Sequence, residues 1–253
     1  MSEEKICSQL KSNLMYKTVE ITLRDGRKII KTFSQKQSYQ RPLDLGYQPL
    51  PSVWFGSDAE LLEKMLEFYP RREPTLILDA TINRGRFWKG SNRPVIGLDI
   101  NPKYNPDVVA DNRNMPFEDE TFDVVVYDPP HIPNQGKDKT KDFNDRFGLP
   151  LRSTAKTQYN LSFLYQPFVK EAYRVLRPEG LLFAKISDYI HNHRYHWAHI
   201  DFIEAARSVG FQACDCIIKI RKGPIIWPKW KKAHHARHQH SYWLIFRKST
   251  KCE

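Results

Sequence analysis

The chain lacks the segments that would tie it to a membrane or to secretion. Its 253 residues contain no stretch of about 18 or more apolar residues, so no transmembrane helix is expected. Residues 1–5 do not show the basic-then-apolar pattern of a secretory signal. We therefore expect a cytoplasmic protein, or a nuclear one in a eukaryote, with no membrane partner.

Cysteine is also scarce, with only Cys7, Cys214, Cys216 and Cys252. Cys214 and Cys216 alternate along a predicted strand, which would place both thiols on one face. We expect reduced cysteines in the core rather than disulfides or a metal site.

The remaining composition is that of an ordinary folded domain. Hydrophobic residues make up 40% of the chain and charged residues 27%, and the length suffices for a full core. Residues 16–33 alternate around Asp25-Gly26 and predict a β-hairpin, followed by an extended connection over 34–56. Ser57 and Glu60 form a capping box that predicts the start of a helix. Further helices are predicted over 161–176 and 198–209, and strands over 181–186, 211–220 and 241–247.

Four short apolar runs are each followed by an aspartate. They end at Asp79, Asp99, Asp111 and Asp128. A single acid after a strand is commonly a turn residue, but the carboxyl ends of parallel strands meet at one edge of a sheet, where ligands bind. We therefore expect the four carboxylates to line one pocket.

The last run breaks abruptly into Asp128-Pro129-Pro130-His131. Two prolines cannot continue a central strand, and they stiffen the backbone so that a carboxylate, a carbonyl and an imidazole are presented together. This arrangement suits the binding of a planar amino group. The alternative is an ordinary strand end, with Asp128 as a solvated cap and His131 facing water.

In this order the motifs resemble the class I methyltransferases that use S-adenosylmethionine. Within that class they are similar to amino-methyltransferases with an Asp-Pro-Pro-aromatic motif, best represented by DNA adenine and cytosine amino-methyltransferases. The resemblance covers residues 52–248. It implies a Rossmann-like α/β fold with a mostly parallel seven-stranded sheet and an antiparallel last strand. The N-terminal β-hairpin and connection (1–51) would precede the catalytic domain (52–253).

The resemblance also implies roles for individual residues, with S-adenosyl-L-methionine as the cofactor. Asp79 and the turn to Gly85 would hold its amino-acid part, Asp99 its ribose hydroxyls, Ile100 its adenine ring and Asp111 the adenine amino group. The expected cofactor-binding residues are Asp79, Ala80, Thr81, Asn83, Gly85, Asp99, Ile100, Asp111, Asn112 and Asp128. The expected catalytic residues are Asp128, Pro129, Pro130 and His131.

The implied reaction is methylation of an exocyclic amino group of adenine or cytosine in DNA. Such a nitrogen is a poor nucleophile because its lone pair is delocalised into the ring. Hydrogen bonds to Asp128 and to the carbonyl of Pro129 would aim that lone pair at the methyl group, and alignment would supply much of the acceleration.

Basic residues are concentrated near the C-terminal end. From Lys219 to Lys251 there are ten Lys or Arg residues and no Asp or Glu, within a chain of net charge +11. Clustered cations with aromatic residues predict a nucleic-acid surface on the connector 221–240, although a solvated basic loop is the alternative. The expected contacts are Lys222, Trp227, Lys229, Trp230, Lys231, Lys232 and Arg237.

Two other segments bear on function. Residues 132–160 predict a long loop that leaves the sheet beside Asp128 and would close over the target base, the alternative being an insertion without a role. The histidines at 234, 235, 238 and 240 have no nearby cysteine or acid to complete a closed site, so no metal is expected.

Three alternative functions remain. The same reaction could act on RNA, because guanine-modifying RNA enzymes share the Asp-Pro-Pro-aromatic device. A more distant relative methylates glutamine side chains, but the basic surface favours DNA or RNA as the partner. The chain could also be a nucleic-acid binding protein that has lost cofactor binding, because Thr81 places a branched side chain where the cofactor carboxylate would lie. Nothing in the sequence predicts an oligomeric state.

Overall fold

The computed structural model describes residues 15–35, 49–131, 161–191, 193–221, 235–236 and 238–249. Their centre is an eight-stranded sheet in the order β3-β11-β12-β8-β7-β4-β5-β6. Within it only β12 is antiparallel to its neighbours, β8 and β11, and β12 is the last strand in the chain. The predicted Rossmann-like α/β fold is therefore confirmed, with β3 as an additional edge strand. The strands are β3 Val53–Trp54, β4 Ile77–Asp79, β5 Val95–Asp99, β6 Val108–Val109, β7 Phe122–Tyr127, β8 Leu176–Ile186, β11 Phe211–Ile220 and β12 His240–Lys248.

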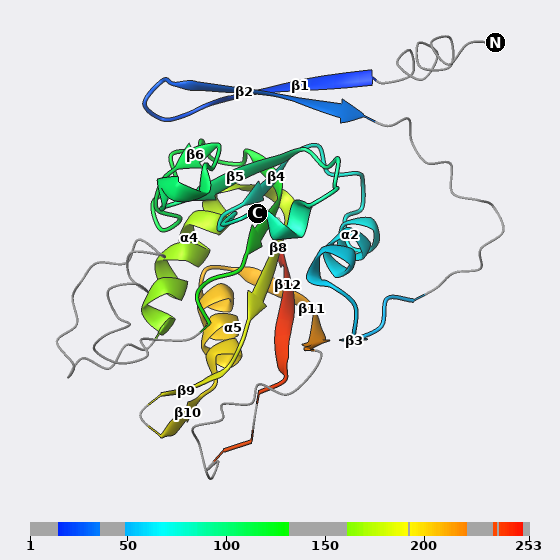
Figure 1. Cartoon of the computed structure of the whole chain (residues 1–253). Helices are drawn as coiled ribbons and strands as arrows, with labels where there is room; N and C mark the ends of the chain where they lie inside the picture. Colours follow the sequence, from blue (N-terminus) through cyan, green and yellow to red (C-terminus); the bar gives the residue numbers. More distant parts are fainter. Residues whose placement is uncertain are drawn as a thin grey trace, which may run out of the picture.

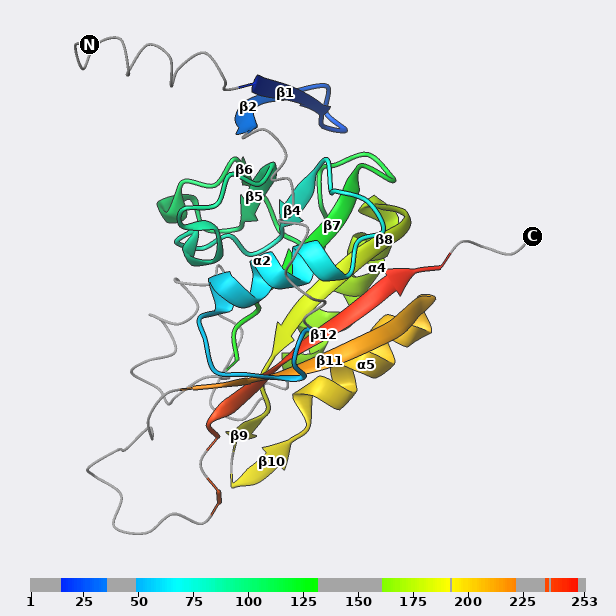
Figure 2. The same cartoon turned by 90° about the vertical axis from the view of Figure 1, so that its right-hand side faces the viewer.

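Helices cover both faces of the sheet (Figures 1 and 2). Helix α2 (Asp58–Phe68) lies on one face, and α4 (Tyr165–Val175) and α5 (Ala198–Ser208) lie on the other. The predicted capping box opens α2: the Ser57 hydroxyl accepts from the Glu60 amide at 3.2 Å, and Glu60 Oε2 accepts from the Ser57 amide at 2.9 Å. Short 3-10 turns are η1 Arg86–Trp88, η2 Pro102–Tyr104 and η3 Leu161–Leu164.

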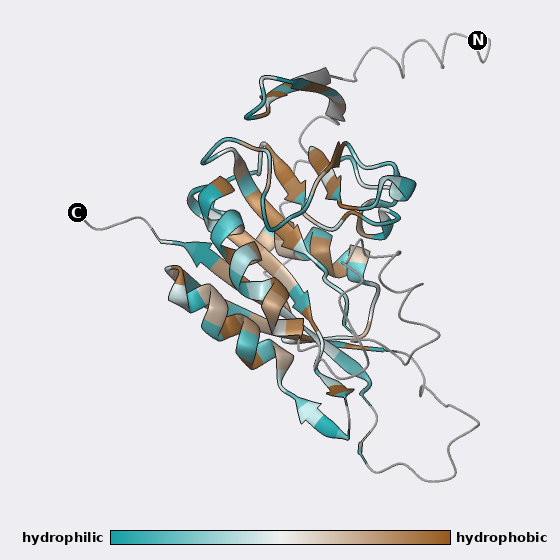
Figure 3. Cartoon of the chain, turned by 90° about the vertical axis from the view of Figure 1, so that its left-hand side faces the viewer, coloured by the Kyte–Doolittle hydropathy of each residue, from teal (hydrophilic) through white to brown (hydrophobic). Residues whose placement is uncertain are grey.

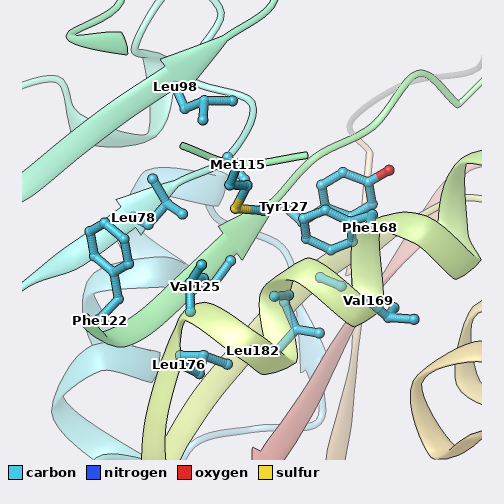
Figure 4. Packing of buried hydrophobic residues seen from close by; sticks show 14 of the residues in the cluster. Leu78, Leu98, Met115, Phe122, Val125, Tyr127, Phe168, Val169, Leu176 and Leu182 are labelled. Atoms are coloured by element: carbon cyan, nitrogen blue, oxygen red, sulfur yellow. The ribbon is translucent and has the colours of Figure 1, made fainter. Parts of the chain in front are cut away.

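The core has two layers because successive strand residues point to opposite faces of the sheet. Leu78 and Val125 pack toward α4 and α5, whereas Ile77 and Val124 pack toward α2. Figure 3 shows the hydrophobic residues gathered along the strands, beneath helices with polar outer surfaces. In Figure 4 the ring of Tyr127, the last residue of β7, lies against Phe168 of α4, with the ring centroids 3.5 Å apart. This stacking fixes the end of β7.

The predicted N-terminal hairpin is formed by β1 (Met15–Thr22) and β2 (Lys28–Gln35), with Gly26 at a φ of +83° in the turn. Leu23 is buried and forms a bridge with Phe117, ahead of β7. Lys31 Nζ donates to the carbonyl of Val95, the first residue of β5, at 2.8 Å. This hairpin therefore packs at the edge where the parallel strands begin, which we call the amino edge (Figure 1).

A second hairpin, which the sequence did not predict, follows β8 at the opposite edge. It consists of β9 (Tyr189–His191) and β10 (Arg194–His196), paired antiparallel as a separate two-stranded sheet. Figures 1 and 2 show it projecting beyond the carboxyl end of β8. We call the edge at which the parallel strands end the carboxyl edge.

Other predictions need correction. Strand β8 begins at Leu176 rather than Leu181, because its first residue already pairs with Phe122 of β7. Cys214 and Cys216 are free but exposed, so the expectation of core cysteines was wrong. Strand β11 has only the two paired residues of β3 beyond it, and its residues from Gln212 to Cys216 are all exposed. Among the described residues, no helix combines the length and apolar character that crossing a bilayer requires.

Candidate functional site

The loop after β4 crosses the carboxyl edge and is tied to both neighbouring strands. The amide of Ala80 donates to the carbonyl of Val126 in β7 at 2.9 Å, and the amide of Ile82 donates to the carbonyl of Leu98 in β5 at 3.0 Å. Ile82 fits there because Gly97 has no side chain; a Cβ at Gly97 would lie 2.7 Å from Ile82 Cγ1. The sequence thus holds this loop directly above the strand ends.

Asp99, the last residue of β5, is bound by backbone amides. Its Oδ2 accepts from the amide of Asn83 and its Oδ1 from the amide of Asn101, both at 2.9 Å. Asn83 has a φ of +48°, a left-handed conformation that asparagine tolerates, so it makes the turn without glycine. Burial raises the pKa of Asp99, even though the amides favour the charged carboxylate.

Asp79, the last residue of β4, is almost fully buried. Its Oδ1 accepts from the amide of Thr81 at 3.0 Å, and its Oδ2 accepts from the indole nitrogen of Trp88 at 2.6 Å. Burial raises the pKa of Asp79 to about 7 against these two hydrogen bonds, and the nearby charges of Asp128 and Asp99 raise it further. A carboxyl that titrates near neutrality therefore lies under the loop.

Asp128 follows β7 and is joined to the same loop. Its backbone amide donates to Thr81 Oγ1 at 2.8 Å, so the branched residue that looked like an obstacle holds the start of the Asp-Pro-Pro segment. Asp128 Oδ1 lies 2.8 Å from His131 Nε2. Burial would raise the pKa of Asp128, but Lys185, the neighbouring His131 and Arg221 lower it overall. Asp128 is therefore ionised at neutral pH.

Asp111 differs from the other three acids because it has an arginine partner. The Arg113 guanidinium binds it with two nitrogens, Nε at 2.9 Å and Nη2 at 2.6 Å. Burial acts to raise the pKa of Asp111, but Arg113 outweighs it and lowers that pKa. Beside it, Asn112 Nδ2 donates to the carbonyl of Ala80 at 3.0 Å and links this segment to the loop after β4.

These residues form one open cleft with a volume of ≈ 60 Å³. Because this volume is small, a ligand of nucleoside size would lie across the cleft rather than inside it. Asp99 and Asp128 both face it, together with Asp111. The lining residues are Ala80, Thr81, Asn83, Asp99, Ile100, Asp111, Asn112, Arg113, Tyr127, Asp128, Pro129, Pro130 and Leu164.

Some of the expected residues lie elsewhere. Gly85, at a φ of +63°, lines a larger groove of ≈ 520 Å³ between β2 and the η1 and η2 segments rather than the cleft itself. Asp79 lies beneath the loop, and His131 reaches the cleft only through Asp128. The loop 132–160 and all seven expected nucleic-acid contacts (Lys222, Trp227, Lys229, Trp230, Lys231, Lys232 and Arg237) fall outside the described residues.

Sequence reasoning missed three polar contributors. Trp88 binds Asp79, Arg113 binds Asp111, and the Thr81 hydroxyl binds the Asp128 amide. The Arg113–Asp111 pair could have been predicted from the sequence, because Arg113 follows Asp111 by two residues. The contact between Trp88 and Asp79 could not, because it depends on how the loop folds. Within the part of the chain that the structure describes, no group of three or more histidine, cysteine or acidic side chains is placed to hold a metal ion.

No protein-family model and no curated protein matches this chain. Among solved structures it is similar to a candidate DNA modification methylase from Thermus thermophilus, with 18% identity, 53% of this chain and 47% of that chain covered, and a TM-score of 0.34. The chain thus spans about half the length of that protein. A S-adenosylmethionine-dependent methyltransferase from Methanosarcina mazei gives 13% identity, 74% and 98% coverage, and a TM-score of 0.46. The 1,6-didemethyltoxoflavin-N1-methyltransferase of Burkholderia thailandensis gives 15%, 76% and 77%, and 0.42. These scores are too low to assign the chain to a family.

Proposed function

We propose that the cleft binds S-adenosylmethionine and that the protein transfers its methyl group to an exocyclic amino group of adenine or cytosine in DNA. The observation that carries this proposal is the convergence of Asp99 and Asp128 in one cleft, above the buried Asp79. Thr81 joins the loop after β4 to the Asp-Pro-Pro segment. The proposed cofactor and target sites are therefore contiguous.

The carboxylates and the apolar surface at the cleft fit this cofactor. Asp79 and Asp99 accept only backbone or indole N–H groups in the described structure, and no cation balances either carboxylate. A ligand with positive charge would supply the missing balance, and ribose hydroxyls could donate to Asp99. Ile100 lines the cleft and offers an apolar surface for a ring. Arg113 already binds the carboxylate of Asp111, so an amino group that donates to Asp111 would share that carboxylate with Arg113.

Bound S-adenosylmethionine would supply an electrophilic methyl group on a sulfonium. The protein's own part is to orient the acceptor nitrogen. Asp128 is ionised, with its Oδ1 beside His131 Nε2, and its carboxylate could accept an amino hydrogen. An amino group held by Asp128 and the Pro129 carbonyl would have its lone pair directed along the line of displacement, so no covalent nucleophile is needed.

Charge supports a nucleic-acid substrate. The chain has a net charge of +11, and Arg221 at the end of β11 lies close enough to lower the pKa of Asp128. A basic side chain whose charge acts on the proposed acceptor site suits a base that carries a phosphate backbone.

The decisive experiment identifies the methylated product. The protein is incubated with labelled cofactor and with single- or double-stranded DNA or RNA, and the nucleic acid is digested to nucleosides for mass analysis. We expect N-methylated deoxyadenosine or deoxycytidine from DNA. Methylation of RNA alone would move the proposal to an RNA base. No product, together with no cofactor binding in calorimetry, would instead favour a nucleic-acid binding protein.

A further inference from the structure

The hairpin β9–β10 lies beside the proposed target site. Tyr127, which precedes Asp128, pairs with Ala184 of β8, and β8 continues through Ile186 into the hairpin. The hairpin therefore leaves the carboxyl edge one strand away from Asp128, and it projects from that edge in Figures 1 and 2. A longer chain that places one of its units in the cleft could therefore also contact this hairpin.

The surface of this segment is aromatic and free of exposed acids. Residues 189–200 contain no Asp or Glu. Trp197 is 56% exposed, and Arg194 is exposed as well. An exposed indole costs free energy in water and is typical of a contact site, because it offers a large rigid face for stacking.

A buried carboxylate fixes the rings around Trp197. Asp188 Oδ2 accepts from the Tyr195 hydroxyl at 3.0 Å, and Asp188 Oδ1 lies 2.7 Å from His199 Nδ1. The Trp197 ring is 4.7 Å from that of Tyr195 and 6.0 Å from that of His199, centroid to centroid. The rings are thus ordered before a ligand arrives, which reduces the entropy lost on binding. We call Arg194, Tyr195, Trp197 and His199 the hairpin platform.

We propose that the hairpin platform binds the single-stranded nucleic acid that flanks the target base, with a base stacked on Trp197 and a phosphate paired with Arg194. This inference rests on the proposed function for the target base, but it concerns a separate surface. Charge complementarity decides the occupant: Asp188 is buried and its carboxylate is used by three hydrogen bonds, so the exposed charge of the platform is positive. Stacking of bases on aromatic rings beside cations is the common mode of single-strand binding.

The test measures binding and methylation separately in the full-length protein. Fluorescence anisotropy with labelled DNA and RNA oligonucleotides compares the wild type with Trp197→Ala, Trp197→Phe and Arg194→Ala. Phe68→Ala and Arg207→Ala are matched controls: Phe68 is an exposed aromatic residue at the end of α2, and Arg207 is exposed at the far end of α5. Thermal unfolding checks that each variant is folded.

We expect Trp197→Ala to weaken oligonucleotide binding about 10- to 100-fold, with partial recovery in Trp197→Phe. Arg194→Ala should make the slope of log K against log salt shallower by about 1, which corresponds to the loss of one phosphate contact. Both variants should raise KM for a long oligonucleotide while leaving kcat unchanged, and the controls should do neither.

The outcomes separate the two proposals. Platform-dependent binding without methylation would support the hairpin platform and overturn the proposed reaction. Methylation with a KM that is the same in wild type, Trp197→Ala and Arg194→Ala would overturn the hairpin platform alone. Methylation of a free nucleoside or another small molecule, with no oligonucleotide binding, would also overturn it. Comparing the affinities for the DNA and RNA oligonucleotides shows which of the two nucleic acids the hairpin platform prefers.

Discussion

Asp79 and Asp99 at the carboxyl edge are partnered differently from the acidic residues at the amino edge. At the amino edge, Asp123 near the start of β7 accepts from the Thr75 amide and hydroxyl on Oδ2, and Arg177 binds its Oδ1 at 3.0 Å. Burial acts to raise the pKa of Asp123, but these partners lower it overall. At the carboxyl edge, Asp79 and Asp99 are bound only by N–H groups among the described residues, and the pKa of each is raised.

This difference distinguishes acids whose charge is balanced within the fold from acids whose charge is not. The amino-edge carboxylates are balanced by arginine or lysine within the protein, as Arg174 also balances Glu171 and Asp119. A buried carboxylate without a cation costs free energy, and such groups concentrate at functional sites. Asp79 and Asp99 therefore have the electrostatics expected of acids beside a cationic ligand.

The largest expected effect comes from replacing, in separate variants, the acid at each end of β7 with alanine. Asp128→Ala should lower the methylation rate at least about 100-fold, because the acceptor amino group loses its orienting carboxylate. Asp123→Ala should leave the rate per folded molecule near that of the wild type. It should lower the free energy of unfolding by about 2 kcal/mol, since Arg177 and the Thr75 amide lose their partner. Single-turnover kinetics and denaturant titration measure the two quantities.

The comparison fails if Asp128→Ala keeps its activity. It also fails if Asp123→Ala loses activity while fully folded, because a balanced amino-edge acid would then take part in the chemistry.

The meeting of Asp99, Asp111 and Asp128 in one cleft was predictable from the sequence, but their partners and the burial of Asp79 beneath the loop were not. A short apolar run that ends in an acid predicts a strand end, and parallel strands end at one edge, so Asp99 and Asp128 were expected to meet. The partner of Asp123 was not predictable, however, because Arg177 lies far along the chain and sequence periodicity carries no information on such a contact. Hairpin β9–β10 was missed for the same reason, since Asp188 orders it through side-chain contacts.

The next effect concerns cofactor binding and pH. If Asp79 must be ionised to balance a cationic amino group, the affinity for S-adenosylmethionine should rise with pH and level off above about pH 7, where the raised pKa of Asp79 lies. Below that pH the affinity should fall by up to about tenfold per pH unit. Calorimetric titration between about pH 6 and about pH 8 measures this, and Asp79→Asn should bind weakly without the dependence. A wild-type affinity that is constant over this range would contradict the assignment.

Without a ligand, the two edges should respond to pH in opposite directions. The folded-state pKa of Asp79 is raised, so its contribution to stability is complete below about pH 4 and is lost as the pH rises through about 7. The pKa of Asp123 is lowered, so its contribution is present above its ordinary pKa and is lost in more acidic solution. Subtracting the stability–pH curves of Asp79→Asn and Asp123→Asn from that of the wild type should give slopes of opposite sign. Slopes of the same sign would mean that the edges are not electrostatically distinct.

The smallest expected effect tests how the loop after β4 is joined to the Asp-Pro-Pro segment. Thr81→Val keeps the branched shape but removes the oxygen that accepts from the Asp128 amide, whereas Thr81→Ser keeps that oxygen. Losing one such hydrogen bond costs about 1 kcal/mol, so we expect kcat to fall about fivefold in Thr81→Val and little in Thr81→Ser. If Thr81→Val instead improved cofactor affinity and left kcat unchanged, the hydroxyl would be an obstacle to the cofactor rather than the link between the cofactor and target sites.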